Sequence, residues 1–362
     1  MPTITKDDLK HHAINSSLFP ATTLGRAIQR LGFIQADPLR VPARAQDLIL
    51  RHRVRDYVVG DLDRRYRALG LEEDFLYAYG FMPRTTWRLL HPRTGPELTP
   101  TERKVLEIVT SKRSLHPQEL EAHLGKEREI NAWGTYSKST TRCLERLHYR
   151  GLIRITGRAN GVRLYGRAAA PHDPLEPEER LRQLILLIAD IFSPSPESGL
   201  RAVIQHLRHG APELHGRKAA LDALIDDGQM DSATVDGVRY LWPKGRINRR
   251  EPPNGVRFLA PFDPVVWDRK RFEHFWGWQY RFEAYTPIAK RQRGHYAMPL
   301  LWRSDIIGWV NVSGGPNDLQ ITPGFVREGH ASDAAFRSAY ALEVERLRGF
   351  LFGSSEDGVR GS

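Results

Sequence analysis

The stretch SKSTTRCLERLHYRGLIRITGRANGVRLY, residues 137–165, decides the predicted fold. Leu144 and Leu147 recur at helical spacing, which predicts an amphipathic helix over residues 137–149. Gly151 ends this helix, and two short runs typical of β-strands follow on either side of a turn over residues 157–161. A helix that leads into a two-stranded hairpin is the second half of a winged helix, a DNA-binding form of the helix-turn-helix motif.

The residues before this stretch supply the two earlier helices of such a unit. Thr99-Pro100-Thr101-Glu102 is a helix start signal, and a second short helix is predicted over residues 115–125. The outward face of the third helix and the hairpin are basic, which favours DNA over the alternative of a module that only packs against protein. The predicted DNA-binding residues of this unit are Lys138, Arg142, Arg146 and Arg158.

The same order of elements recurs further along the chain, which strengthens the prediction. Apolar periodicity predicts helices over residues 178–192, 199–207 and 216–225. A hairpin follows, with Asp236-Gly237 as its turn signal. We interpret residues 1–94 as a third unit of this kind.

Beyond residue 250 the sequence changes to runs of aromatic and β-branched residues, which predict an antiparallel sheet. We expect strands over residues 256–260, 280–285, 295–302 and 306–312 and a helix over residues 268–275. The predicted fold class is therefore α+β, with tandem winged-helix units followed by a C-terminal antiparallel β-domain. The predicted division is residues 1–94, 95–168, 169–250 and 251–330, then a closing helix at 331–352 and a disordered tail at 353–362.

The chain is strongly basic, with 54 Lys and Arg residues against 43 Asp and Glu residues, a formal net charge of +11 and a pI near 9.8. This excess favours nucleic acid as a partner over the alternative of acidic membrane lipid. The sequence has no uninterrupted apolar run of about 18 residues, and its first residues lack the apolar segment of a secretion signal. We therefore expect a cytoplasmic protein without a membrane partner.

The sequence also argues against a disulfide framework and a metal site. Cys143 is the single cysteine, and its helical spacing with Leu144 and Leu147 predicts a buried thiol. The histidines show no zinc-ligand spacing, and we expect no metal and no cofactor. Because no heptad pattern predicts a dimer helix, we expect a monomer.

Residues 33–38, FIQADP, carry a candidate catalytic pair. Phe33 and Ile34 begin a short extended run, and alternation along it places Gln35 and Asp37 on the same side. An amide beside a carboxylate could hold and activate one water molecule. The alternative is a strand end at which Asp37 is a solvated cap.

Two groups of motifs resemble one known family. Near the N-terminus, Ile34-Gln35-Ala36-Asp37 followed by Ala43-Arg44-Ala45 is similar to a Gln-x-Asp catalytic motif and its Ala-Arg-Ala continuation. The C-terminal signature comprises Pro261-Phe262-Asp263-Pro264, Trp267-Asp268-Arg269, Gly277 with Tyr280, Glu283-Ala284-Tyr285-Thr286-Pro287, Lys290-Arg291, Gly294-His295-Tyr296 and Pro299-Leu300-Leu301. In wording and spacing these motifs resemble the AlkZ/YcaQ family, which are bacterial winged-helix DNA glycosylases, over nearly the whole chain.

The resemblance implies a monofunctional DNA glycosylase of DNA repair. Its substrates would be alkylated purines in double-stranded DNA: N7-alkylguanine, bulky adducts and bases in interstrand cross-links. Asp37 would be the general base, and Gln35 would orient the water. Because a cationic N7-alkylguanine is already a good leaving group, neither a metal nor a covalent intermediate is required.

One stretch departs from the family pattern. Family members commonly carry Tyr-Trp-Ala-His after an aromatic strand, which we expect here over residues 75–79, whereas this chain has Tyr77-Ala78-Tyr79-Gly80. Tyr77 and Tyr79 are candidates for stacking in a lesion pocket. Packing in the core is the alternative.

Further basic residues are predicted to contact DNA. The run over residues 244–250 directly follows a hairpin strand, and Lys290-Arg291 stands near Gly294. A solvated linker and a charged turn are the alternatives. The remaining predicted DNA-binding residues are Arg44, Arg51, Lys244, Arg246, Arg249, Arg250, Lys290 and Arg291.

Two non-catalytic functions stay open. The same winged helices could belong to a regulator that binds a DNA sequence. They could also belong to a protein that binds damaged DNA without cutting the glycosidic bond.

Overall fold

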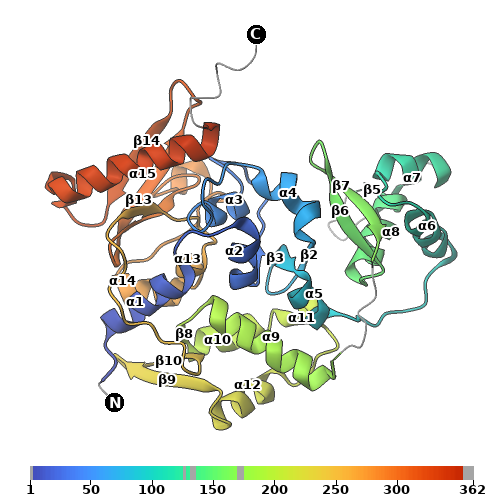
Figure 1. Cartoon of the computed structure of the whole chain (residues 1–362), viewed down its shortest axis with the longest axis horizontal. Helices are drawn as coiled ribbons and strands as arrows, with labels where there is room; N and C mark the ends of the chain where they lie inside the picture. Colours follow the sequence, from blue (N-terminus) through green and yellow to red (C-terminus); the bar gives the residue numbers. More distant parts are fainter. Residues whose placement is uncertain (1–2, 125–127, 131–135, 169–174, 354–362) are drawn as a thin grey trace. The chain divides into compact units, whose positions relative to one another are not determined.

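The computed structural model describes residues 3–124, 128–130, 136–168 and 175–353 of the chain. Its helices and small antiparallel sheets give a mixed α+β structure (Figure 1). The chain forms two compact units: unit 1 comprises Met1–Leu62, Ile185–Ile204 and Lys218–Ser362, and unit 2 comprises Asp63–Leu184 and Gln205–Arg217. The predicted division by winged-helix repeats stays a prediction, and its C-terminal tail lies outside the described residues apart from Gly353.

Unit 1 begins with short helices and ends in a sheet that a long helix covers. Its elements are α1 (Lys6–Ser17), α2 (Leu24–Leu31), β1 (Ile34–Gln35), α3 (Ala45–Leu50), β8 (Ser195–Pro196), α10 (Glu197–Ile204), β9 (Met230–Val235), β10 (Val238–Pro243), β11 (Val256–Phe258), α13 (Pro264–Trp267), α14 (Arg269–Trp276), η1 (Ile288–Lys290), β12 (Met298–Trp302), β13 (Asp305–Ser313), β14 (Gln320–Phe325), η2 (His330–Ser332) and α15 (Ala334–Phe352). Three helices cross the unit boundaries: α4 (Asp61–Leu69), α9 (Pro177–Ile191) and α12 (Arg217–Asp226).

The first helices of unit 1 form where the sequence carries cap signals. The Thr5 hydroxyl accepts the Asp8 N–H at 3.1 Å and Asp8 accepts the Thr5 N–H at 2.9 Å, which caps α1. Gly32 ends α2 with a φ of +67°, in the left-handed region. A Cβ at Gly32 would lie 2.5 Å from a methyl carbon of Leu187, so a larger residue would displace that side chain.

The C-terminal part of unit 1 is a four-stranded antiparallel sheet in the order β11-β12-β13-β14. Helix α15 lies along it (Figure 1) and packs the rings of Phe336 and Tyr340 against Trp302 and Phe258, at centroid distances of 5.8 and 5.3 Å. The strands predicted at residues 256–260, 295–302 and 306–312 are confirmed, with shifted ends, and so is the closing helix.

The strand predicted over residues 280–285 is wrong, because this segment belongs to a loop. The Glu283 carboxylate accepts the backbone N–H groups of Gln292, Arg293 and Gly294 at 2.8–3.2 Å, which folds the segment onto itself. Aromatic residues alone favoured a strand, and this side-chain bonding overrides that propensity. The fourth strand is β14 instead, an edge strand whose Pro323 and Gly324 hide it from pattern analysis.

A buried ion pair joins the N-terminal and C-terminal segments of unit 1. Arg53 and Asp263 are both 0 % exposed, and two guanidinium nitrogens lie 2.8 and 3.0 Å from the carboxylate oxygens. Arg53 also donates to the Ser17 carbonyl at 2.9 Å and the Ser17 hydroxyl at 2.7 Å. Removing either partner of such a pair strongly destabilises the folded protein, because the other charge would remain buried alone.

Unit 2 contains short helices and two-stranded hairpins. Beyond the helices that cross its boundaries, its elements are β2 (Leu71–Phe75), β3 (Tyr79–Pro83), α5 (Arg84–Leu90), α6 (Pro100–Ser111), α7 (Pro117–Leu124), β4 (Arg128–Ile130), β5 (Tyr136–Lys138), α8 (Ser139–Tyr149), β6 (Ile153–Ala159), β7 (Val162–Arg167) and α11 (Leu207–Gly210).

The predicted order of three helices and a hairpin is present twice along the chain. The first copy is α6, α7, α8 and the β6–β7 hairpin, with Asn160 and Gly161 at φ values of +50° and +81° in its turn. The second is α9, α10, α12 and the β9–β10 hairpin, with Asp236 and Gly237 at +50° and +76°; here the short helix α11 is inserted between α10 and α12. Helix α8 begins at Ser139 and not at residue 137, because β5 pairs with β4 just before it.

The strand predicted over residues 75–79 is wrong, because the run contains a hairpin turn. Strand β2 ends at Phe75, β3 begins at Tyr79, and the two strands pair. The Leu76 N–H donates to the Ala78 carbonyl at 2.9 Å within the turn. Since residues 76–78 contain no Gly, Pro, Asn or Asp, the sequence carries no turn signal there.

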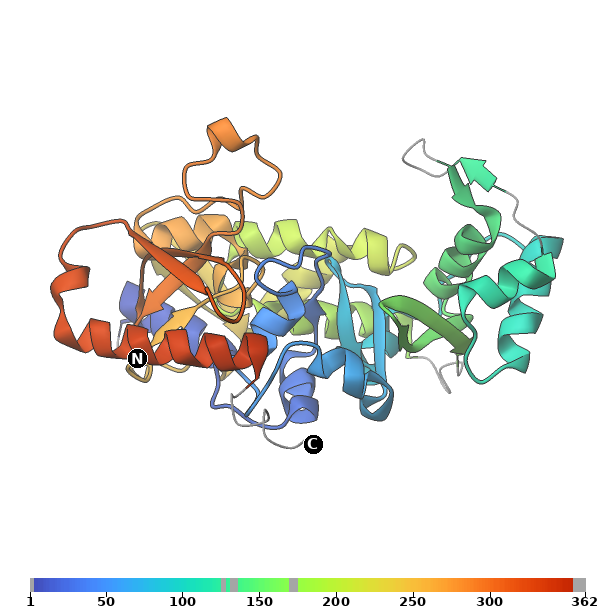
Figure 2. The ribbon, with the colours of Figure 1, turned by 90° about the horizontal axis from the view of Figure 1, so that it is seen from above.

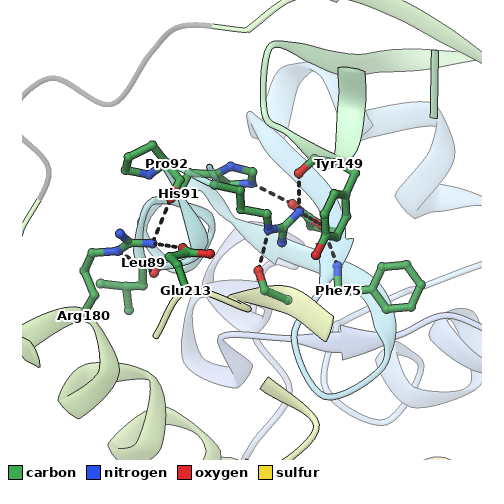
Figure 3. Close-up of polar contacts among 10 residues, drawn as sticks. Phe75, Leu89, His91, Pro92, Tyr149, Arg180 and Glu213 are labelled. Carbon is green, nitrogen blue, oxygen red and sulfur yellow. Dashed lines mark hydrogen bonds and ion pairs between the residues drawn. The ribbon is translucent and has the colours of Figure 1, made fainter. Parts of the chain in front are cut away.

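Buried charged side chains hold unit 2 together (Figure 3). The Arg93 guanidinium donates to Asp74 at 3.0 Å and to the carbonyl of Gly210, and His91 lies 2.8 Å from the second Asp74 oxygen. Arg180 forms an ion pair with Glu213 at 3.0 Å. These contacts explain why residues 205–217 belong to unit 2.

None of the described helices is long and apolar enough to cross a membrane.

His12 in α1 is a buried, neutral histidine of unit 1. Its Nδ1 accepts the Asn248 N–H at 3.2 Å, so the proton of the neutral ring sits on Nε2, which donates to the Ser193 hydroxyl at 2.7 Å. This tautomer excludes His12 as a general base toward Ser193. Burial, with a contribution from the charge of Arg271, lowers the pKa of His12 from 6.5 to about 4.

The low pKa of His12 predicts a loss of stability in mild acid. The unfolded chain binds a proton at this residue below pH 6.5, whereas the folded chain does so only near pH 4. Stability is therefore complete above pH 6.5 and falls toward pH 4, by about 2 kcal/mol at pH 5. Urea unfolding of the wild type and His12→Gln at pH 8 and pH 5 should show a smaller pH difference in the variant. His215→Gln, which alters an exposed histidine, is the control; an equal pH difference in the wild type and His12→Gln would contradict the expectation.

Candidate active site

The Gln35–Asp37 pair lies directly after α2 in unit 1. Phe33 and Ile34 are buried and anchor the short strand β1, whereas Gln35 and Asp37 are partly exposed. The turn at Gly32 directs the chain from α2 into this strand. The strand covers only Ile34–Gln35 of the predicted extended run, and both polar residues are partly accessible.

Gln35 is held by a tryptophan that is far away in the sequence. The indole N–H of Trp267, the last residue of α13, donates to the Gln35 side-chain oxygen Oε1 at 2.9 Å. The Trp267 ring also lies against the ring of Phe192, with centroids 4.7 Å apart and planes tilted by 36°. The amide of Gln35 is therefore fixed in one orientation.

Asp37 is a half-buried carboxylate that makes few stabilising bonds. Its Oδ1 accepts the Leu39 N–H at 2.9 Å across Pro38. Burial raises the pKa of Asp37 above its ordinary value, and the Leu39 hydrogen bond only partly opposes this rise. A carboxylate with a raised pKa is a stronger base, which suits proton abstraction from water.

A buried tyrosine lies near Asp37. Tyr296 is 3 % exposed, its ring packs edge-to-face on Phe282 at 5.3 Å, and its hydroxyl has no hydrogen-bond partner among the described residues. Burial and the nearby charge of Asp37 raise the pKa of Tyr296. A buried hydroxyl without a partner is unusual, and this one is a donor available to a group bound beside Asp37.

The loop over residues 283–294 leads into this tyrosine and projects from the rest of unit 1 (Figure 2). The Glu283 carboxylate closes its base, and Arg291 donates to the Thr286 carbonyl at 2.7 Å. At its tip Tyr285 is 74 % and Ile288 is 80 % exposed. The tip is thus an apolar surface on an internally bonded loop.

The predicted DNA-binding residues of unit 1 differ in their accessibility. Lys244, Arg246, Arg250 and Lys290 are exposed, and Arg44, Arg249 and Arg291 are partly exposed. The side chain of Arg51 is 3 % exposed and forms an ion pair with Glu343, so a phosphate would have to displace that carboxylate.

Two of the predicted DNA-binding residues of unit 2 have acidic partners. Arg146 lies 2.9 Å from Glu102, and Arg158 donates to both oxygens of the buried Glu73 at 2.5 and 2.7 Å. Arg142 is partly exposed, and the side chain of Lys138 lies outside the described part of the chain. DNA contact by these residues stays a prediction.

Tyr77 and Tyr79 belong to unit 2, whereas the Gln35–Asp37 pair belongs to unit 1. Tyr77 is buried, and the Tyr79 hydroxyl donates to Glu73 at 3.2 Å while Arg163 lies over its ring at 4.9 Å. Tyr79 also lines a cavity of about 800 Å³ within unit 2. Their role in a lesion pocket stays a prediction.

Sequence reasoning did not identify Trp267 and Tyr296 as site residues. Both stand inside the C-terminal signature, which was their only signal. Among the described residues, no three His, Cys, Asp or Glu side chains gather where they could hold a metal ion.

Comparisons with known proteins find similarity to one family over nearly the whole chain. A family model described as DNA glycosylase AlkZ-like matches residues 28–350. Among solved structures, the Streptomyces sahachiroi DNA glycosylase AlkZ is similar with a TM-score of 0.63, over 96% of this chain and 97% of that chain, at 14% sequence identity. At this identity the structural likeness shows the fold.

The unpartnered hydroxyl of Tyr296 predicts an unusual stability effect. Tyr296→Phe removes a buried polar group without breaking a hydrogen bond, so the free energy of unfolding should be unchanged or rise by up to about 1 kcal/mol. Tyr280→Phe is the matched control, because the buried Tyr280 hydroxyl donates to the Ala297 carbonyl at 2.7 Å and its loss should cost about 1–2 kcal/mol. Urea unfolding measures both; an equal loss in the two variants would contradict the assignment.

Proposed function

Because the chain belongs to the AlkZ-like DNA glycosylase family, we propose that it hydrolyses the N-glycosidic bond of alkylated purines in double-stranded DNA. Asp37 activates the attacking water and Gln35 orients it. The substrates are N7-alkylguanine, bulky adducts or interstrand cross-links. The enzyme acts as a cytoplasmic monomer in DNA repair and uses no cofactor.

The reaction requires the protein to activate a water molecule and to place a negative charge near the sugar. N7-alkylation makes guanine cationic, so the bond between N9 and C1′ breaks as its electron pair moves into the purine and neutralises it. The water oxygen forms a bond to C1′, and its proton passes to Asp37. The carboxylate also stabilises the positive charge that develops on the sugar. The products are the free base and an abasic site.

The observation that supports this proposal is the half-buried Asp37 carboxylate, two residues after a Gln35 amide that Trp267 holds. Burial that raises the pKa of Asp37 strengthens it as a base while it stays partly accessible. A solvated cap, the alternative interpretation, would lack this burial. Tyr296 adds a donor that could bind the carboxylate or the sugar.

DNA binding follows from the repeated order of helices and hairpins in a basic chain. In a winged helix the third helix enters the major groove and the hairpin contacts the backbone. The exposed residues Lys244, Arg246, Arg250 and Lys290 supply positive charge for phosphates. We include the loop over residues 283–294 in the DNA-binding surface, because apolar residues at its tip stand next to Lys290 and Arg291.

Asp37→Asn should slow catalysis and keep DNA binding. The amide cannot take a proton from water, so base release should slow by at least about 100-fold. The affinity for lesion-containing duplex should stay within a few-fold, because phosphate contacts carry most of it. Single-turnover release of N7-methylguanine, read as alkali-labile abasic sites, and fluorescence anisotropy measure the two quantities.

The competing functions give different outcomes in the same assay. Wild-type chain that binds duplexes carrying N7-methylguanine or a nitrogen-mustard cross-link without releasing a base would reject the glycosylase and favour a damage-binding protein. Equal affinity for lesion and intact DNA, with preference for one sequence, would favour a regulator.

Removing positive charge from the loop over residues 283–294 should weaken DNA binding and make it less sensitive to salt. Lys290→Ala/Arg291→Ala should reduce the slope of log Kd against log salt concentration by about 2, because two phosphate contacts are lost. Arg337→Ala/Arg348→Ala removes the same charge from the exposed face of α15 and is the control. DNA titrations at several salt concentrations measure this slope. If both double variants changed it equally, the loop would have no special role in DNA binding.

A further inference from the structure

The bond between Trp267 and Gln35 determines which end of the amide faces the bound substrate. An indole N–H is only a donor, so it identifies the group at 2.9 Å as the oxygen Oε1 and not the NH2 group. The NH2 group must then point away from Trp267. In the described part of the chain it makes no hydrogen bond, and the Gln35 side chain is partly exposed.

Trp267 itself is held firmly, so the orientation it imposes is stable. The Asp263 side chain accepts the Val265 N–H at 3.1 Å and caps α13, and the backbone N–H of Trp267 donates to the Asp263 carbonyl at 2.9 Å. Asp263 is fixed in turn by the buried ion pair with Arg53. The tilted ring of Phe192 restrains the indole from the side.

An amide in this orientation complements Asp37 in the activation of water. Alternation along the extended run is expected to place Gln35 and Asp37 on the same side, so that a donor and an acceptor face the same place. A water there accepts a hydrogen bond from the Gln35 NH2 group and donates one to Asp37. Its second lone pair stays free for C1′. The opposite orientation would present two acceptors and would leave the water without a donor from Gln35.

We propose that Trp267 is a positioning residue that directs the NH2 group of Gln35 toward the water which Asp37 deprotonates. This inference rests on the proposed glycosylase function. It also gives the tryptophan of the C-terminal signature a role beyond packing. Trp267 acts through Gln35 and touches neither the substrate nor the water.

A double-mutant cycle tests the inference in the full chain with a duplex that carries N7-methylguanine. Trp267→Phe keeps the aromatic ring and removes the N–H, so the single-turnover rate of base release should fall about 10- to 100-fold with unchanged Kd. In the Gln35→Ala background the same change should alter the rate less than twofold, because the group it positions is already absent. Trp276→Phe is the control, since Trp276 donates to the Ser304 carbonyl at 3.0 Å and should leave the rate unchanged.

Gln35→Glu distinguishes the orientation of the Gln35 amide from the packing of its side chain against Trp267. The carboxylate still accepts the indole N–H but has no donor for the water, so its plateau rate across pH should fall as far as that of Gln35→Ala. A wild-type rate in Trp267→Phe or in Gln35→Glu, or full additivity of Trp267→Phe with Gln35→Ala, would overturn the inference and leave the glycosylase assignment intact. Absence of base release by the wild type would overturn both.

Discussion

The buried ion pair between Arg53 and Asp263 is the constraint on which unit 1 depends. It connects residues shortly after the Gln35–Asp37 pair to the C-terminal signature, 210 positions later, with no exposure to solvent. A buried pair of this kind contributes little net stability compared with a well-packed apolar pair, but it tolerates few other arrangements of its partners. In unit 1 the ion pair fixes the position of Asp263, and Asp263 also caps the helix that carries Trp267.

The candidate site is therefore assembled from segments that meet only in the folded chain. Gln35 ends the short strand β1 and Asp37 follows it, Trp267 comes from α13, and Tyr296 comes from the end of the loop that Glu283 closes. Each of these side chains has its position set by a hydrogen bond or ring contact outside the reaction itself. This is the preorganisation that a hydrolase needs, because groups that are already placed need not reorient as charge develops.

Local signals in the sequence predicted the parts of the fold that local interactions determine. The Thr99 helix start, Gly151 and the Asp236-Gly237 turn each carry their own structural requirement, and the elements they mark are present. The strand predicted at residues 280–285 failed because one carboxylate bonds the backbone of residues 292–294. In the site, alternation along a strand predicted that Gln35 and Asp37 share a side. The bond to Trp267 spans 232 positions, and no periodicity encodes such a contact.

The contacts of α15 have a consequence for the order in which the protein can mature. Arg51 forms an ion pair with Glu343, and the Val59 N–H donates to the Phe350 carbonyl at 3.1 Å. These contacts of the segment after the candidate catalytic pair can therefore form only when residues up to 292 positions later have been synthesised. At about 5–20 residues per second on the ribosome, that delay is roughly 15–60 s. The Gln35–Asp37 segment is thus synthesised well before the helix that completes the contacts of the residues following it.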